Sequence, residues 1–229
     1  MKLSEVEEKL KTEGFSEDLF SLFLAGLKRV RGNYNKCQHC YTTAYALKGK
    51  DYEGAIRMVH YGLENFAESW IDFYRSYENL ARIYLRRDRF AEARECYLAE
   101  LEKMTEFKAE QYTDVLAVDL VFAEMHCEDF ACTDNLRKYY GLAGSDLAKT
   151  AFTRRERFYY ALAALVIALH DLGPEGAKPA WRDVMCILKG LDANANDEIL
   201  RRHRYLNDAY ATGQALRYLE KTALLLHED

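Results

Sequence analysis

The sequence predicts an all-α fold, and three features of its composition lead to this prediction. Of the 229 residues, 58 are leucine or alanine and only 14 are valine or isoleucine. Leucine and alanine favour helices, whereas β-branched residues favour strands. Charged residues make up 30% of the chain, and its two prolines are Pro174 and Pro179. This composition excludes the β-rich classes and is typical of helices joined by short polar turns.

The first 32 residues predict two short helices that form an N-terminal cap. Ser4, with Glu7 three residues later, has the pattern of a capping box, and Gly14 is expected to end this first helix. Ser16 is expected to cap the second helix, because apolar residues recur at helical spacing from there up to Val30.

Residues 34–190 predict a series of helical hairpins. The expected helices pair as 37–47 with 51–64, 68–86 with 89–106, and 109–127 with 130–140. A further helix is expected to begin at Ser145 or Asp146 and to end at Leu172. Gly173 then stops it, and Pro174 suits the first position of the next helix, which is expected to end near residue 190.

The C-terminal segment 197–229 predicts one long helix that follows the polar run 192–197. Its apolar positions form one expected stripe: Ile199, Leu206, Ala209, Tyr210, Leu216, Leu219 and Ala223. The whole chain, 1–229, is therefore expected to be one elongated domain, made of the cap, the hairpins and this last helix.

Residues 74–107 resemble a tetratricopeptide repeat. The positions that match the family's pattern are Tyr77, Leu80, Ala81 and Tyr84 in the first helix, and Ala93, Tyr97 and Glu100 in the second. A shift of 38 residues superposes 51–55 on 89–93, so 36–69 is similar to a weaker preceding repeat. This resemblance implies hairpins stacked as a right-handed superhelix with a concave groove, lined by exposed positions of each first helix.

The resemblance also implies a non-catalytic scaffold or adaptor whose groove binds a protein or peptide. The expected groove residues are Arg75, Glu78, Asn79, Arg82, Arg86 and Tyr41. Asn79 falls where peptide-binding members of the family often carry an asparagine that holds the ligand backbone. The arginines predict an acidic peptide, a C-terminal carboxylate or a phosphate as ligand, because guanidinium groups pair bidentately with such anions. The alternative is a solvated face on which Glu78 pairs with Arg82.

A second hypothesis concerns Cys37 and Cys40, which form a CxxC motif that can hold zinc or perform dithiol redox chemistry. A closed zinc site needs two more ligands, for which His126, Cys127 and Cys132 are the candidates. The competing interpretation is that these cysteines are reduced thiols that pack as small apolar residues. A third hypothesis is a structural homo-oligomer, for example a homodimer, formed through the C-terminal helix.

Charge and motifs limit the remaining classes of function. The net charge of −5 argues against nucleic-acid binding and against binding to a membrane surface, both of which need a positive footprint. The longest apolar stretch, 159–169, is too short to cross a bilayer, and residues 1–11 lack the apolar run of a signal peptide, so we expect a cytoplasmic protein. We find no HExxH, P-loop or serine-hydrolase motif, and therefore expect neither an enzyme nor a cofactor.

Overall fold

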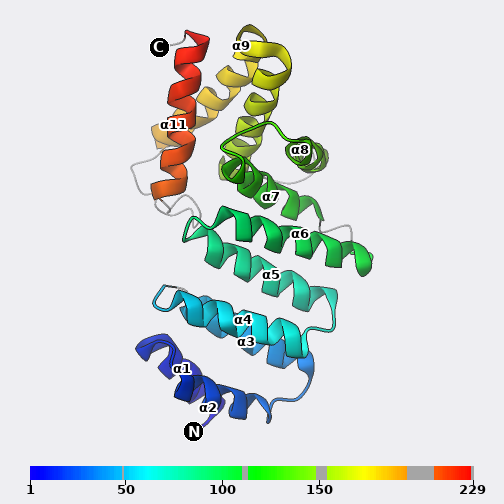
Figure 1. The fold of residues 1–229 in the computed structure, drawn as a ribbon, viewed down its shortest axis with the longest axis vertical. Coiled ribbons are helices and arrows are strands. Elements are labelled where there is room, and N and C mark those ends of the chain that lie inside the picture. Colours follow the sequence, from blue (N-terminus) through cyan, green and yellow to red (C-terminus); the bar gives the residue numbers. More distant parts are fainter. Residues whose placement is uncertain (48, 110–112, 148–153, 195–208, 228–229) are drawn as a thin grey trace. The chain divides into compact units, whose positions relative to one another are not determined.

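The computed structural model describes residues 1–47, 49–109, 113–147, 154–194 and 209–227 (Figure 1). Within these ranges the regular secondary structure is entirely α-helical, which confirms the predicted fold class. Contacts divide the chain into two compact units. The N-terminal unit comprises Met1–Arg87 and Glu95–Ala109, and the C-terminal unit comprises Asp88–Arg94 and Glu110–Asp229.

The N-terminal unit is built from consecutive helices joined by short turns. They are α1 (Leu3–Glu13), α2 (Glu17–Leu27), α3 (Asn33–Leu47), α4 (Tyr52–Phe66), α5 (Trp70–Leu85) and most of α6 (Phe90–Glu106). α3 packs closely against α4, and α5 contacts both of them. α4 and α6 begin 38 residues apart, as the superposition of their sequences predicts.

Capping residues explain where several of these helices begin. Ser16 accepts a hydrogen bond from the Leu19 amide (3.2 Å) and Asp51 accepts one from the Gly54 amide (2.9 Å), as predicted. The prediction for Ser4 is wrong, because α1 begins at Leu3 and the Lys2 amide donates to the Glu5 carboxylate (2.9 Å). The first turn therefore starts two residues earlier than the S-x-x-E pattern indicated.

The contact between α3 and α4 depends on a residue without a side chain. A Cβ atom added at Gly62 of α4 would lie 2.8 Å from the Cβ of Cys40 on α3. Such a separation is shorter than van der Waals contact, so only glycine allows the two helices to come this close. Cys40 and Ala44 of α3 and Val59 of α4 are fully buried in this unit.

The C-terminal unit contains α7 (Thr113–Cys127), α8 (Asp134–Leu147), α9 (Arg154–Asn194) and α11 (Ala209–Leu226). α9 consists of two helices that meet at Gly173, whose φ of 68° and ψ of −177° are not helical, as the Gly-Pro pair predicts. The expected helix start at Ser145 or Asp146 is wrong, because both residues lie in the last turn of α8. The expected start of the last helix falls outside the described residues.

An aromatic cluster forms part of the core of the C-terminal unit. His126 lies 4.5 Å from Phe90, 4.3 Å from Phe122 and 5.0 Å from Phe130, measured between ring centroids. Tyr159 of α9 packs edge-on against Phe122 at 4.5 Å. His126, which is 8% exposed, is thus a core residue.

The C-terminal helix packs on α9 of its own chain. Its buried residues are Ala215, Leu219, Thr222 and Leu226. The predicted stripe is therefore displaced in part: Leu219 is buried as expected, but Leu216 is 39% exposed. Tyr218 also stacks on Phe130, with ring centroids 4.6 Å apart and planes at 16°.

Helices α6 and α7 each end in a turn of the same type, and neither turn has glycine at the position with positive φ. Lys108 follows α6 at φ 55°, and the Ala109 amide donates to the Met104 carbonyl (2.8 Å). Asp129 follows α7 at φ 51°, and the Phe130 amide donates to the Met125 carbonyl (2.6 Å). This bonding pattern satisfies carbonyl groups that a helix end leaves without partners.

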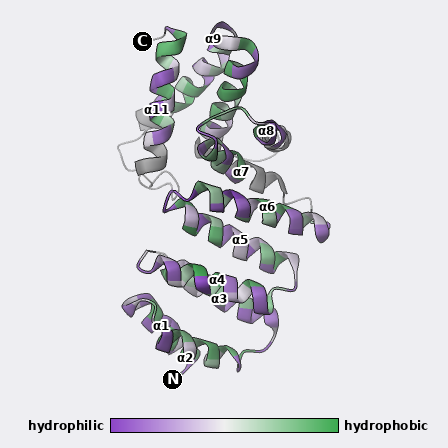
Figure 2. Cartoon of the chain, in the orientation of Figure 1, coloured by the Kyte–Doolittle hydropathy of each residue, from purple (hydrophilic) through white to green (hydrophobic). Residues whose placement is uncertain are grey.

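Hydrophilic and hydrophobic residues alternate around the helices of the N-terminal unit, as the hydropathy colours show (Figure 2). In the part of the chain that the structure describes, no helix combines the length and the apolar character that a membrane span requires.

We expect Gly62→Ala to destabilise the protein and Gly141→Ala to stabilise it. The added methyl group at position 62 would overlap Cys40, and overpacking of this kind costs about 1–3 kcal/mol. Gly141 lies exposed in α8, where an added Cβ meets nothing within 4 Å, so replacing it recovers up to about 1 kcal/mol of helix propensity. Denaturant unfolding of both variants measures whether the free energy of unfolding decreases for Gly62→Ala and increases for Gly141→Ala. Equal effects of the two substitutions would contradict the close approach of α3 and α4.

Candidate functional site

Four of the six predicted groove residues, Arg75, Glu78, Asn79 and Arg82, lie on α5, and three of these four form one charged cluster. Glu78 accepts from Arg82 at 2.5 Å and from Arg75 at 3.4 Å, so two guanidinium groups share one carboxylate. The Glu78 side chain is only 11% exposed, whereas that of Arg75 is 48% exposed. The solvated-face alternative thus correctly anticipated the pairing of Glu78 with Arg82, and Arg75 is the looser partner.

Asn79 and Arg86 have different environments from this cluster. Asn79 is buried, and its side-chain amide donates to the Arg75 carbonyl at 2.7 Å, within its own helix. Arg86 is exposed immediately after the last residue of α5. The structure therefore places Arg86 at the surface and gives the Asn79 amide a partner inside the helix.

Tyrosines from α3 and α5 border the charged cluster. Burial raises the pKa of Tyr41 on α3 to about 12, while the nearby charge of Arg75 opposes this shift. Burial also raises the pKa of Tyr74 on α5 to about 12, and the charges of Glu78 and Glu100 add to the effect. Arg75 additionally lies over the Tyr74 ring, 5.1 Å from its centroid.

We call this set the polar strip of the N-terminal unit. It consists of Tyr41, Tyr74, Arg75, Glu78, Arg82 and Arg86. The sequence identified all of these residues as a candidate site except Tyr74, which is in contact with Arg75 and electrostatically close to Glu100 of α6. Only the packing of α5 on its neighbours could reveal that Tyr74 belongs to the strip.

Asp72 secures the start of α5. Its Oδ2 atom accepts from the Ser69 amide at 3.0 Å and from the Ser69 hydroxyl at 2.7 Å. The side chain is 2% exposed. The S-x-x-D spacing of Ser69 and Asp72 is a sequence signal that could have located this helix start.

The CxxC cysteines, Cys37 and Cys40, lie buried in the core of the N-terminal unit. Burial raises the pKa of the Cys37 thiol to about 11, and it raises the pKa of Cys40 well above its usual range. The Cys37 sulfur lies 3.5 Å from the Ser76 hydroxyl. Metal binding and redox chemistry use the thiolate, which these environments disfavour at neutral pH. Within the described residues no group of three or more His, Cys, Asp or Glu side chains could hold a metal ion.

His39, inside the CxxC motif, contacts the N-terminal cap. Its Nδ1 atom lies 2.6 Å from the Glu7 carboxylate on α1, and the Thr43 hydroxyl donates to the same oxygen at 3.3 Å. The three residues that make these contacts line a polar cleft of about 340 Å³. Glu7, which sequence reasoning assigned to a capping box, instead joins α1 to α3.

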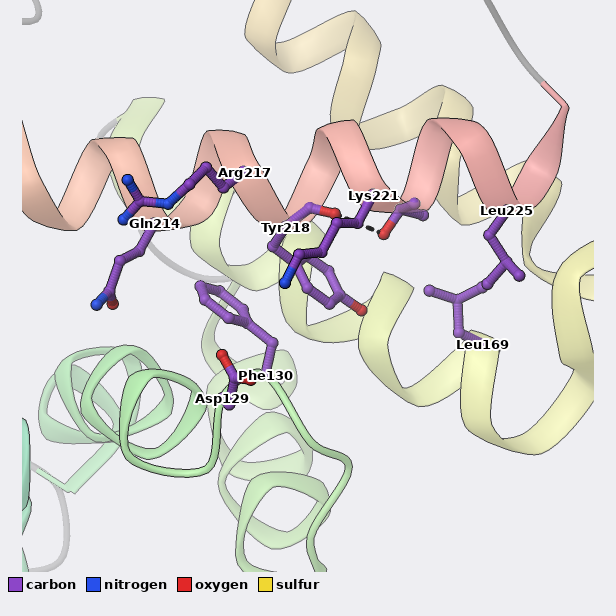
Figure 3. Close-up of a pocket in the computed structure, with 9 residues that line it drawn as sticks. Asp129, Phe130, Leu169, Gln214, Arg217, Tyr218, Lys221 and Leu225 are labelled. Carbon is purple, nitrogen blue, oxygen red and sulfur yellow. Dashed lines mark hydrogen bonds between the residues drawn. The ribbon is translucent and has the colours of Figure 1, made fainter.

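A larger cavity, of about 440 Å³, lies in the C-terminal unit between α9, α11 and the turn that follows α7 (Figure 3). Polar lining residues are Asp129, Gln214, Arg217, Lys221 and Thr222. Leu169, Leu225, Phe130 and Tyr218 supply its apolar surface. This site has no local signal in the sequence, because it forms only when α11 packs against a turn more than 80 residues earlier in the chain.

Comparison with known proteins gives no family assignment for this chain. No family model matches it, and neither a curated protein nor a solved structure is significantly similar to it.

We expect the native protein to react with thiol reagents first at Cys186, which is exposed on α9. Cys37, Cys40 and Cys96 are buried and should react only on unfolding. Mass spectrometry after brief labelling at pH 8, with and without denaturant, shows in which order the cysteines react. Early modification of Cys37 or Cys40 in the native protein would show that these thiols are accessible and ionisable.

The same thiols make stability depend on alkaline pH. An unfolded cysteine ionises near pH 8.5, whereas burial raises the pKa of native Cys37 to about 11. Between these values the native state binds more protons, so the free energy of unfolding decreases as pH rises. Replacing Cys37 and Cys40 together by alanine should flatten this decrease, measured by denaturant unfolding from pH 8 to 11. An unchanged slope would contradict the raised pKa values.

Proposed function

We propose that this protein is a non-catalytic scaffold that binds a peptide segment of another protein on the polar strip of its N-terminal unit. The proposal includes a tetratricopeptide-like stacking of the helical hairpins, in which α3 and α5 are the groove-lining first helices. Support comes from the burial of the matching positions Leu80, Ala81 and Ala93, which are at most 1% exposed.

The observation that carries the proposal is the uneven pairing of the two arginines with Glu78. Arg82 lies 2.5 Å from one carboxylate oxygen, whereas Arg75 lies 3.4 Å from the other and keeps about half of its side chain exposed. A ligand carboxylate can therefore attract Arg75 without leaving Glu78 unpaired in its buried position. Breaking the closer Arg82–Glu78 pair would be costly, because Glu78 is buried. A ligand carboxylate can instead replace Glu78 as the partner of Arg75.

The tyrosines give the strip its second recognition element. Tyr41 is buried on α3 with its phenol near Arg75, and the Tyr74 ring supports the Arg75 guanidinium. Tyrosine and arginine are enriched among residues that dominate binding energy at interfaces. The chemistry of the strip therefore favours an acidic side chain or a C-terminal carboxylate on the bound peptide.

Peptide selection provides the test. A displayed random-peptide library is selected on the immobilised protein, and the recovered peptide is titrated by fluorescence anisotropy. We expect Arg75→Glu to weaken binding by at least about tenfold, or about 1.4 kcal/mol, because it replaces an attraction by a repulsion. Arg82 is a poorer choice, since its replacement also removes the closer of the two guanidinium groups that pair with the buried Glu78 carboxylate.

Arg29→Glu is the matched control. Arg29 is exposed after α2 in the same unit, and its substitution makes the same change in charge away from the strip. Circular dichroism checks that both variants fold. The proposal is wrong if selection yields no binding peptide, or if Arg75→Glu and Arg29→Glu bind the selected peptide equally well.

A homodimer through α11 is the second candidate, favoured by two adjacent exposed leucines. Leu224 is 79% exposed and Leu225 is 53% exposed, although the opposite side of α11 is buried on α9. If these leucines are an interface, the protein should scatter light as a dimer and Leu224→Glu should convert it to a monomer. A monomeric mass for the unmodified protein at about 100 μM would exclude a stable dimer of micromolar affinity.

A further inference from the structure

We propose that the cavity beneath α11 binds a small amphipathic carboxylate, meaning an apolar chain that ends in a carboxylate group. This site lies within the C-terminal unit and uses none of the residues of the polar strip. Its volume of about 440 Å³ falls within the range of small-ligand pockets. The distribution of charge and apolar surface around the cavity determines the ligand class.

The cationic wall comes from one face of α11. Gln214, Arg217 and Lys221 follow one another at intervals of three and four residues and line the same side of the cavity. Lys221 is exposed and forms no ion pair within the described part of the chain. Asp129 is the single acidic residue among the described residues that line the cavity, whereas Arg217 and Lys221 are both basic. Arg217 already interacts within the chain, so Lys221 is the cation that can pair with a ligand carboxylate. This balance favours an anion.

The apolar wall is separate from the charged groups. Figure 3 shows Leu169 of α9 and Leu225 of α11 together at one end, while Gln214 and Lys221 extend toward the turn that carries Asp129 and Phe130. A ligand with a charged head and an apolar tail can therefore satisfy both ends. Burial of each methylene group of such a tail contributes about 0.8 kcal/mol.

The turn that closes the cavity is held in an unusual conformation. Asp129 and Phe130 both have positive φ values, 51° and 61°, a region that costs roughly 1–2 kcal/mol for a residue with a side chain. In this conformation the Phe130 ring stacks on Tyr218 and becomes part of the cavity wall. Strain of this kind persists where packing enforces it, and it clusters at ligand-binding positions.

Calorimetric titration of the full chain with sodium octanoate tests the proposal, with octylamine as the oppositely charged probe of the same length. We expect octanoate to bind and octylamine to bind at least about tenfold more weakly. Lys221→Glu should weaken octanoate binding by about tenfold or more. Asp129→Asn should strengthen it severalfold, because the variant removes the one acidic side chain among the described residues that line the cavity.

Lys189→Glu is the matched control, since Lys189 is exposed on α9 and is not part of the cavity lining. It should leave octanoate affinity unchanged. Leu225→Ser, at an exposed position of the apolar end, should weaken octanoate binding without unfolding the protein. The proposal is overturned if octanoate does not bind, if octylamine binds as tightly, or if Lys221→Glu and Lys189→Glu have equal effects.

Discussion

The N-terminal unit depends on the close approach of α3 and α4 at Gly62. Because no side chain separates the helices there, Cys40 fills the contact and both CxxC thiols become buried. The same contact fixes the rotation of α3, so that α1 and α5 pack on its remaining surface. Tyr41 is thereby brought near Arg75. The electrostatics of the polar strip thus follow from a steric constraint on the α3–α4 contact.

The sequence predicts much of the secondary structure, because the relevant signals are local. Helical propensity gives the fold class, and capping at Ser16 and Asp51 and the stop at Gly173 depend on residues within one turn of the helix end. The failures have a physical cause as well. Glu5 competes with the predicted cap at Ser4, and nothing local at Asp146 distinguishes the last turn of α8 from the first turn of a new helix.

The candidate sites likewise contain features that local sequence predicts and features that depend on packing between helices. The pairing of Glu78 with Arg82 is predictable, since the two residues are four apart on one helix. The contribution of Tyr41 and the burial of Asn79 depend on how α5 packs against α3, which periodicity does not specify. The cavity beneath α11 is harder to predict from the sequence, because it requires Phe130 at a positive φ and the stacking of Tyr218 on the Phe130 ring.

The two proposed sites differ in how their charges are balanced, and this difference determines what each can recognise. On the polar strip Glu78 already compensates part of the charge of Arg75 and Arg82, so a ligand carboxylate gains only what it adds to an existing pair. As proposed, recognition there combines the charge of Arg75 with tyrosine contacts and with the geometry of the peptide. In the cavity, Lys221 has no such internal partner within the described residues, so the charge of the ligand itself contributes directly to binding. In these two proposals, the strip adds shape to a partly compensated charge, whereas the cavity depends directly on the charge of its ligand.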